Sequence, residues 1–131
     1  KRGINISYKN DGKNKYLIYG IENRIEQIVA NLLDNAISFS DDNKDVVVHV
    51  SKSEDNKVHV KILDEGQGFK EKDTNKIFKR FYSNRPDKFG QHSGLGLNIV
   101  KNLVDLHNAT IKASNRYDKK GASMEIEFPK V

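Results

Sequence analysis

The stretch Arg24-Ile-Glu-Gln-Ile-Val-Ala-Asn-Leu-Leu-Asp-Asn-Ala-Ile-Ser38 decides the fold of this chain. Its apolar residues recur at intervals of three and four, the spacing of one face of an α-helix, and they are Ile25, Ile28, Val29, Leu32, Leu33 and Ala36. The pattern predicts a helix from about Asn23 to Phe39, with Asn23 as a candidate N-cap.

The polar face of this helix carries two asparagines, Asn31 and Asn35, whose side chains point the same way one turn apart. Taken alone, the pair is most simply interpreted as part of a solvated face. A second interpretation is that the amide oxygens are hard, neutral ligands for Mg²⁺ beside a bound phosphate. The rest of the chain has to decide between the two.

Composition limits the classes of protein to consider. A chain of 131 residues with 36% hydrophobic and 31% charged residues predicts one globular domain. The absence of Cys excludes a disulfide framework and Cys-ligated zinc. The net charge is +5, but the lysines are scattered and aromatic content is only 8%, which argues against a nucleic-acid-binding protein and suits a binder of anionic small molecules.

Alternating apolar residues on both sides of the helix predict strands. An opening hairpin is expected over residues 4–8 and 16–19, and a second hairpin over 46–50 and 58–62. A second helix is expected from Leu97 to Leu106, followed by strands over 110–114 and 124–128. The four histidines lack the spacing of a zinc site.

The second hairpin runs into Asp64-Glu-Gly66-Gln-Gly68-Phe69. The two glycines allow positive φ and close approach of a ligand, and the aspartate can accept a hydrogen bond from an exocyclic amine such as that of adenine. By itself the motif is more typical of a plain turn with a capping Asp than of a ligand site.

A long irregular segment, about residues 70–93, follows; such a segment is usually a functional lid or disordered, and Phe78 and Phe81 could anchor it to the core. It leads to Ser93-Gly-Leu-Gly-Leu97 at the start of the second helix. Free backbone N–H groups and the positive end of the helix dipole meet there, which favours phosphate binding. The motif is neither a P-loop nor a dinucleotide fingerprint.

Four motifs therefore occur in a fixed order, and in this order the chain resembles the catalytic, ATP-binding domain of bacterial sensor histidine kinases, within the GHKL ATPase superfamily. Asn31–Asn35 looks like the N box, Asp64–Gly68 the G1 box, Ile77–Tyr82 the F box and Gly94–Leu97 the G2 box. The resemblance implies an α+β fold, the Bergerat two-layer α/β sandwich, with a mixed, mostly antiparallel sheet and three helices on one face. It implies one catalytic domain over residues 1–131, without the dimerisation domain that carries the acceptor histidine.

The resemblance also implies roles for residues. Asn35 is expected to bind Mg²⁺ and Asn31 to lie beside the phosphates, both in catalytic positions. Asp64 matches the carboxylate that binds the adenine amine, and Gly66 and Gly68 match the glycines that admit the base. The expected ATP-binding residues are Asn31, Asn35, Phe39, Asp64, Gly66, Gly68, Phe69, Arg85, Ser93, Gly94, Leu95, Gly96 and Leu97.

Three positions depart from the family pattern. Ser38 stands where a Lys often reaches the phosphates, Ser83 where many F boxes end in Arg, and His92 where the first glycine of the G2 box is usual. The first two departures remove positive charge near the phosphates, and we expect Arg85 or Lys88 on the lid to compensate.

The implied activity is transfer of the γ-phosphate of Mg²⁺-ATP to a histidine of the parent sensor kinase. Hydrolytic relatives carry a Glu base where this chain has Asn31, whose amide cannot accept a proton at neutral pH, so negligible ATPase activity is expected from the domain alone. In the family an acidic residue follows the acceptor histidine, and no histidine of this chain is followed by one. The acceptor histidine is therefore expected upstream of this domain, in the parent kinase.

The resemblance further implies ATP and ADP as ligands, the acceptor domain as a partner and, indirectly, a response regulator. The domain alone is expected to be monomeric, in a homodimeric parent kinase whose cytoplasmic part it forms at the inner membrane. One alternative is a nucleotide-binding pseudokinase that acts as a protein-interaction module, supported by the three departures. Another is a nucleic-acid-binding ATPase relative.

Overall fold

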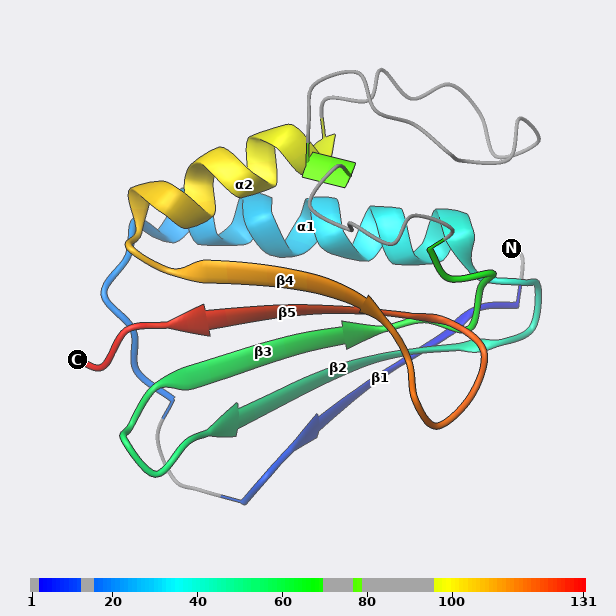
Figure 1. The fold of residues 1–131 in the computed structure, drawn as a ribbon, viewed down its shortest axis with the longest axis horizontal. Helices are drawn as coiled ribbons and strands as arrows, with labels where there is room; N and C mark the ends of the chain where they lie inside the picture. Colours follow the sequence, from blue (N-terminus) through cyan, green and yellow to red (C-terminus); the bar gives the residue numbers. More distant parts are fainter. Residues whose placement is uncertain (1–2, 13–15, 70–76, 79–95) are drawn as a thin grey trace.

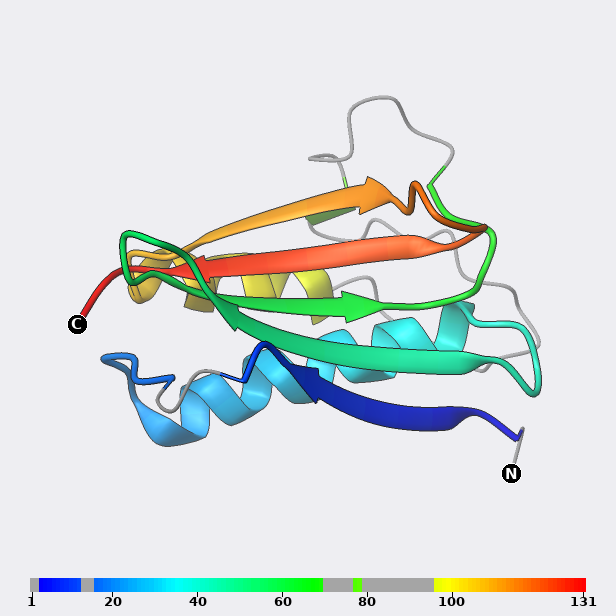
Figure 2. The ribbon, with the colours of Figure 1, turned by 90° about the horizontal axis from the view of Figure 1, so that it is seen from below.

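A five-stranded mixed sheet with two helices on one face forms the part of the chain that the computed structural model describes, residues 3–12, 16–69, 77–78 and 96–131 (Figure 1). The elements are, in order, β1 (Asn5–Asn10), α1 (Glu22–Phe39), β2 (Asp45–Lys52), β3 (Val58–Leu63), α2 (Gly96–Leu106), β4 (Thr110–Asn115) and β5 (Ala122–Phe128). The strand order is β1-β2-β3-β5-β4, in which only the β1–β2 pair is parallel. Figure 2, seen from below, shows both helices behind the same face of the sheet. This confirms the α+β sandwich, with two α-helices in these residues where three were expected.

The core lies between the helices and that face of the sheet. The apolar stripe that predicted α1 is buried at Ile28, Leu32 and Ala36, and α2 contributes Val100 and Val104. Alternate residues of the strands meet them from below, because successive side chains of a strand point to opposite faces. These strand residues are Val46, Val58, Ile62, Met124 and Ile126. Each large side chain buried here contributes roughly 1.5–3 kcal/mol to stability.

The prediction of an opening hairpin is wrong. β1 pairs in parallel with β2, with Ile6 opposite Val46, and residues 16–21 form no strand. The carboxylate of Asp11 accepts a hydrogen bond from the backbone N–H of Lys52 at 2.8 Å, which ties the turn after β1 to the end of β2. Tyr16 and Ile18 then pack against the edge of the core on the way to α1. The local pattern predicted a strand at 16–19 as the partner of β1, but β1 pairs with β2 instead.

The start of α1 also differs from the prediction. The helix begins at Glu22 with Ile21 as N-cap, so Asn23 lies in the first turn and is not the cap. An isoleucine side chain cannot cap a helix. Instead, the backbone N–H of Ile21 donates to Nε2 of His107 at 3.1 Å, while Nδ1 of His107 is 2.7 Å from the carbonyl oxygen of Leu103. Because Nδ1 bonds an acceptor, it carries the proton, and Nε2 is the acceptor for Ile21. The end of α2 thus holds the beginning of α1.

The predicted β2–β3 hairpin and the second helix are confirmed. None of the helices in the described ranges is long and apolar enough to span a membrane. At one end of the sheet, β3 ends, α1 ends and the β4–β5 turn begins, so three segments distant in sequence meet there (Figure 1).

Candidate functional site

Asp64, the residue after β3, is the best-defined polar group at this end of the sheet. It is only 4% exposed, although it carries a carboxylate. Its Oδ1 accepts hydrogen bonds from the backbone N–H groups of Gly66 at 2.9 Å and Ala122 at 3.0 Å. Both donors meet one oxygen, so among the described residues Oδ2 is left to accept from a ligand.

Burial raises the pKa of Asp64 above its ordinary value, and the two backbone donors and the guanidinium of Arg116 oppose that rise. Nη1 of Arg116 donates to the backbone carbonyl of Asp64 at 3.1 Å. The same guanidinium pairs with Asp118 through Nε at 3.0 Å and Nη2 at 2.9 Å. The carboxylate and the backbone carbonyl of Asp64 are therefore both held by fixed donors of the protein.

The two glycines of the Asp64–Phe69 segment are required by the fold. A Cβ on Gly66 would lie 2.1 Å from the carbonyl oxygen of Phe39, because Gly66 forms a bridge with Ser40 just after α1. Gly68 has φ +79°, and a Cβ there would lie 2.5 Å from Oδ1 of Asn115. The protein itself occupies the space beside each glycine, so neither needs a bound base to explain it.

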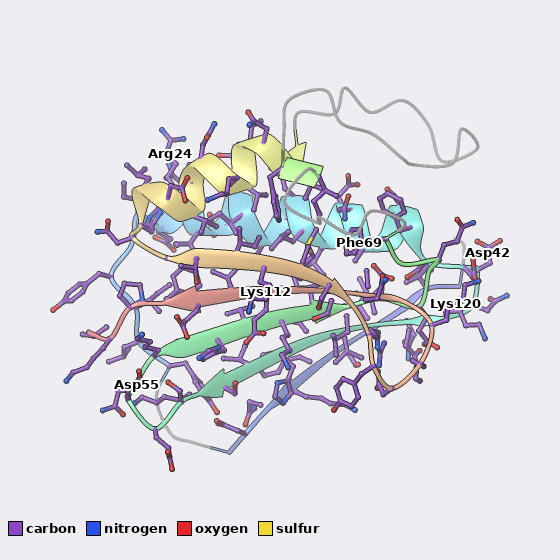
Figure 3. All side chains as sticks on the ribbon, in the orientation of Figure 1. Arg24, Asp42, Asp55, Phe69, Lys112 and Lys120 are labelled. Carbon is purple, nitrogen blue, oxygen red and sulfur yellow. The ribbon has the colours of Figure 1, made fainter. Side chains whose placement is uncertain are left out.

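The segment is fastened at its far end as well. The side chain of Asn115, the last residue of β4, accepts from the N–H of Phe69 at 2.6 Å and donates to its carbonyl at 3.2 Å. Figure 3 places Phe69 near the end of α1, at the same end of the molecule as Asp42 and Lys120 and opposite Asp55. The candidate site is therefore formed by the end of α1, the segment after β3 and the β4–β5 turn.

The two asparagines of α1 differ in exposure. Asn35 is buried, with 4% of its surface exposed, and Asn31 is half-buried. A solvated face does not explain a buried asparagine, so that simple interpretation fails for Asn35. Asn35 lies one helical turn, about 6 Å, before Phe39, whose carbonyl contacts the Gly66 region. Asn35 therefore lies in the last two turns of α1, toward the same end of the molecule as Asp64 (Figure 1).

Ser38, a polar residue near the end of α1, is also buried, at 7% exposure. Phe39 is half-buried beside it. A serine at this depth cannot replace the reach of a lysine toward phosphates. The departure at this position therefore changes both charge and length of the side chain.

The F-box segment is described at two residues, Ile77 and Phe78, and both are buried in the core. The predicted anchoring by Phe78 is confirmed, and Nδ2 of Asn98 in α2 donates to its carbonyl at 3.1 Å. α2 begins at Gly96, with Leu97 packed against the core. The expected site residues Arg85, Ser93, Gly94 and Leu95 lie outside the described residues, as do Phe81, Ser83, Lys88 and His92.

Sequence reasoning missed Asn115, Arg116 and Ala122, which hold the Asp64–Phe69 segment in place. The run Asp118-Lys-Lys-Gly121 indicates a turn there, but nothing in the pattern links that turn to Asp64. Within the described ranges, no group of three or more His, Cys, Asp and Glu side chains could hold a metal ion. An Asn amide oxygen, such as that of Asn35, is a different kind of ligand and does not belong to such groups.

Comparison with known proteins agrees with this geometry. Residues 20–131 match the family model described as histidine kinase-, DNA gyrase B- and HSP90-like ATPase. The chain is 38% identical over 135 residues to the sensor protein ChvG of Agrobacterium fabrum, covering 98% of this chain and 22% of that protein. It is 32% identical over 127 residues to sporulation kinase A of Bacillus subtilis, covering 97% and 20%. The chain thus spans about a fifth of the length of these relatives.

Solved structures share the fold. A mycobacterial sensor histidine kinase, MprB, superposes with a TM-score of 0.83 at 25% identity, covering 97% of this chain and 82% of that one. The nucleotide-free catalytic domain of histidine kinase ThkA gives a TM-score of 0.82 at 27% identity, covering 98% and 80%. The chain therefore belongs to the histidine kinase-, DNA gyrase B- and HSP90-like ATPase family, as the ATPase domain of a sensor histidine kinase.

Proposed function

We propose that this domain binds Mg²⁺-ATP and transfers the γ-phosphate to a histidine on the dimerisation domain of a longer parent kinase. The observation that carries the proposal is the buried carboxylate of Asp64, whose Oδ1 is saturated by two backbone donors. Burying a carboxylate costs free energy, and a hydrogen bond from an adenine amine to Oδ2 would offset part of that cost. Family membership supports the same assignment.

The residues proposed for the nucleotide follow from position along the site. Asp64 binds the base, with Phe39, Gly66, Gly68 and Phe69 forming the backbone around it. Gly96 and Leu97 open α2, where free N–H groups and the helix dipole favour the phosphates. Arg85, Ser93, Gly94 and Leu95 are proposed to complete the phosphate side.

Asn35 is proposed to bind Mg²⁺ through its amide oxygen, with Asn31 one turn before it beside the phosphates. Bound Mg²⁺ neutralises phosphate charge during transfer. The residues of the chain align the reacting groups, because a protein catalyses phosphoryl transfer mainly by positioning groups and neutralising charge. Asn31 cannot accept a proton at neutral pH, so the domain holds ATP without activating water and leaves the phosphate for the acceptor histidine.

The partners belong to the proposal too. A histidine kinase of this fold, ThkA, has been solved in complex with a response regulator protein, TrrA. We infer that the parent of this domain likewise passes its phosphate to a response regulator. Residues 1–131 would form its single catalytic domain, at the cytoplasmic side of a membrane-anchored homodimer.

The test is calorimetric titration with ADP and a non-hydrolysable ATP analogue, with and without Mg²⁺, on the wild type and Asn35→Ala. We expect binding by the wild type and a loss of its Mg²⁺ dependence in the variant. Removing one polar contact to a charged group typically costs roughly 1.5–3 kcal/mol of binding free energy. Phosphate transfer to a supplied acceptor domain is the second stage. A wild type that binds nucleotide but never transfers phosphate would support the pseudokinase alternative, and one that binds no nucleotide would contradict the proposal.

A further inference from the structure

The β4–β5 turn, residues 116–121, and Ala122 at the start of β5 together hold both polar backbone groups of Asp64 and one of its side-chain oxygens. The N–H of Asp64 donates to the carbonyl of Ala122 at 3.0 Å, and the N–H of Ala122 donates to Oδ1 at 3.0 Å. The carbonyl of Asp64 accepts from Nη1 of Arg116 at 3.1 Å. Only one of these contacts, the guanidinium of Arg116, comes from a side chain that mutation can remove cleanly.

Arg116 is held in a fixed position beside the backbone of Asp64. Its side chain is 8% exposed, and Asp118 fixes the guanidinium plane by a paired interaction through Nε and Nη2. Gly121 has φ +145°, and a Cβ there would lie 2.0 Å from the carbonyl oxygen of Asp64. The turn therefore packs directly on the carbonyl that Arg116 binds. The planar guanidinium can bind the carbonyl of Asp64 and the carboxylate of Asp118 at the same time. A lysine would offer only a single point charge for both contacts.

The same strand pair fastens the other end of the segment. Asn115 precedes Arg116 and bonds both backbone groups of Phe69. The loop from Asp64 to Phe69 is thus braced at both ends by adjacent residues of β4 and its turn. Any change in the turn would move the carboxylate relative to the end of α1, where Phe39 contacts Gly66.

We propose that Arg116 is a positioning residue for base recognition, which holds Asp64 so that its Oδ2 selects the adenine amine. The inference rests on the proposed function, because it takes Asp64 as the group that reads the base. Adenine offers an amine to this oxygen, whereas guanine offers a carbonyl oxygen that the carboxylate repels. A rigidly held carboxylate discriminates between the two, and one that can swing away discriminates less.

The experiment is calorimetric titration of ADP and GDP on the wild type, Arg116→Met, Arg116→Lys and Arg24→Met. Arg24 is exposed on the first turns of α1, at the other end of the molecule from Phe69, so its variant removes the same charge without touching the site (Figure 3). We expect Arg116→Met to lower ADP affinity roughly tenfold, the worth of one charged hydrogen bond. The preference for ADP over GDP should fall with it, partly in Arg116→Lys and not at all in Arg24→Met.

A pH series gives a readout that a merely structural role would not move. Two charged groups act on Asp64 from neighbouring elements: Arg116 lowers its pKa and Asp41, after α1, raises it. Without Arg116 the pKa of Asp64 rises further, so ADP affinity should decline at a higher pH during acidification than in the wild type. An unchanged pH midpoint together with an unchanged ADP-to-GDP ratio would overturn the inference, even if Arg116→Met is less stable.

Asn115→Ala keeps the inference testable if Arg116→Met fails to fold. Asn115 is exposed, so its hydrogen bonds compete with water and its loss should cost little stability. It should still weaken the ADP preference by freeing the Phe69 end, and an unaltered preference would count against the bracing argument. Absence of ADP binding by the wild type would instead overturn the proposed function, so the two failures are distinguishable.

Discussion

At the scale of single residues, the site depends on a carboxylate that the fold tolerates at a cost. Burial raises the pKa of Asp64, so the folded state holds its proton more tightly than the unfolded chain does. The stability linked to this proton is fully present below the ordinary pKa and is lost as pH rises through the raised value. At neutral pH Asp64 therefore weakens the fold, which is typical of a group kept for binding.

Replacing Asp64 with Asn separates these two effects. The N–H donors of Gly66 and Ala122 will face the amide oxygen, which leaves the NH₂ group toward the adenine amine, donor against donor. We expect Asp64→Asn to bind ADP roughly 10- to 100-fold more weakly. Its stability relative to the wild type should increase from about pH 4 to pH 7, since it carries no acidic proton. Urea unfolding across that range measures the stability. A decrease in the stability of the variant relative to the wild type with rising pH would contradict this account.

Two glycines distinguish what the fold requires from what a ligand requires. Gly66→Ala places a methyl 2.1 Å from the backbone carbonyl of Phe39, which cannot move without shifting the end of α1, and should cost about 1–3 kcal/mol. A Cβ on Gly96 meets no atom of the described residues within 4 Å, so Gly96→Ala should alter stability by less than about 0.5 kcal/mol. If phosphates approach the start of α2, Gly96→Ala will nevertheless weaken ADP binding. Urea unfolding and ADP titration of both variants check this, and equal losses of stability would refute it.

At the scale of elements, His107 joins the two helices. It accepts from the N–H of Ile21 at the start of α1 and bonds the carbonyl of Leu103 in α2, with only 8% of its surface exposed. α1 has no side-chain cap of its own, so this imidazole satisfies a donor that otherwise lies unpaired at the helix start. The packing of α1 on α2 thus includes one specific polar contact.

His107→Ala removes that contact and leaves the part-buried N–H of Ile21 without its acceptor, whereas the carbonyl of Leu103 keeps the backbone N–H of residue 107. We expect a loss of about 1–3 kcal/mol in the free energy of unfolding, measured with urea, and fraying of the first turn of α1 in hydrogen exchange. His49→Ala is the matched control, a histidine on β2 away from the helices, and should change stability by less than about 0.5 kcal/mol. If both variants lose the same stability, His107 has no special role in joining the helices.

At the scale of the whole molecule, ligand binding and folding are linked. A nucleotide that binds only the folded domain stabilises it by about 2.7 kcal/mol at 100 times its Kd. For a domain of 131 residues this corresponds to an increase in Tm of about 4 °C per kcal/mol. Thermal unfolding with increasing ADP measures the effect. Asp64→Asn, with its 10- to 100-fold weaker binding, should be stabilised by only about 0.4–1.4 kcal/mol at the same ADP concentration, and an equal shift in both would place the nucleotide elsewhere.

Local patterns in the sequence determined most elements of this protein. The apolar stripe of Ile28, Leu32 and Ala36 determined α1, since burying one helical face is what stabilises a helix in a protein. Alternation determined β2 and β3, and the order of four short motifs indicated the family. These features were readable because each depends on neighbours a few residues apart.

Tertiary structure alone decided three other features. β1 pairs in parallel with β2, so the hairpin predicted over residues 4–8 and 16–19 does not form. The start of α1 depends on His107, 86 residues from Ile21 along the chain. Arg116 and Ala122 position Asp64 across 52 and 58 residues. Such contacts are set by which segments the packed core brings together, and no periodicity records them, because their partners share no local pattern.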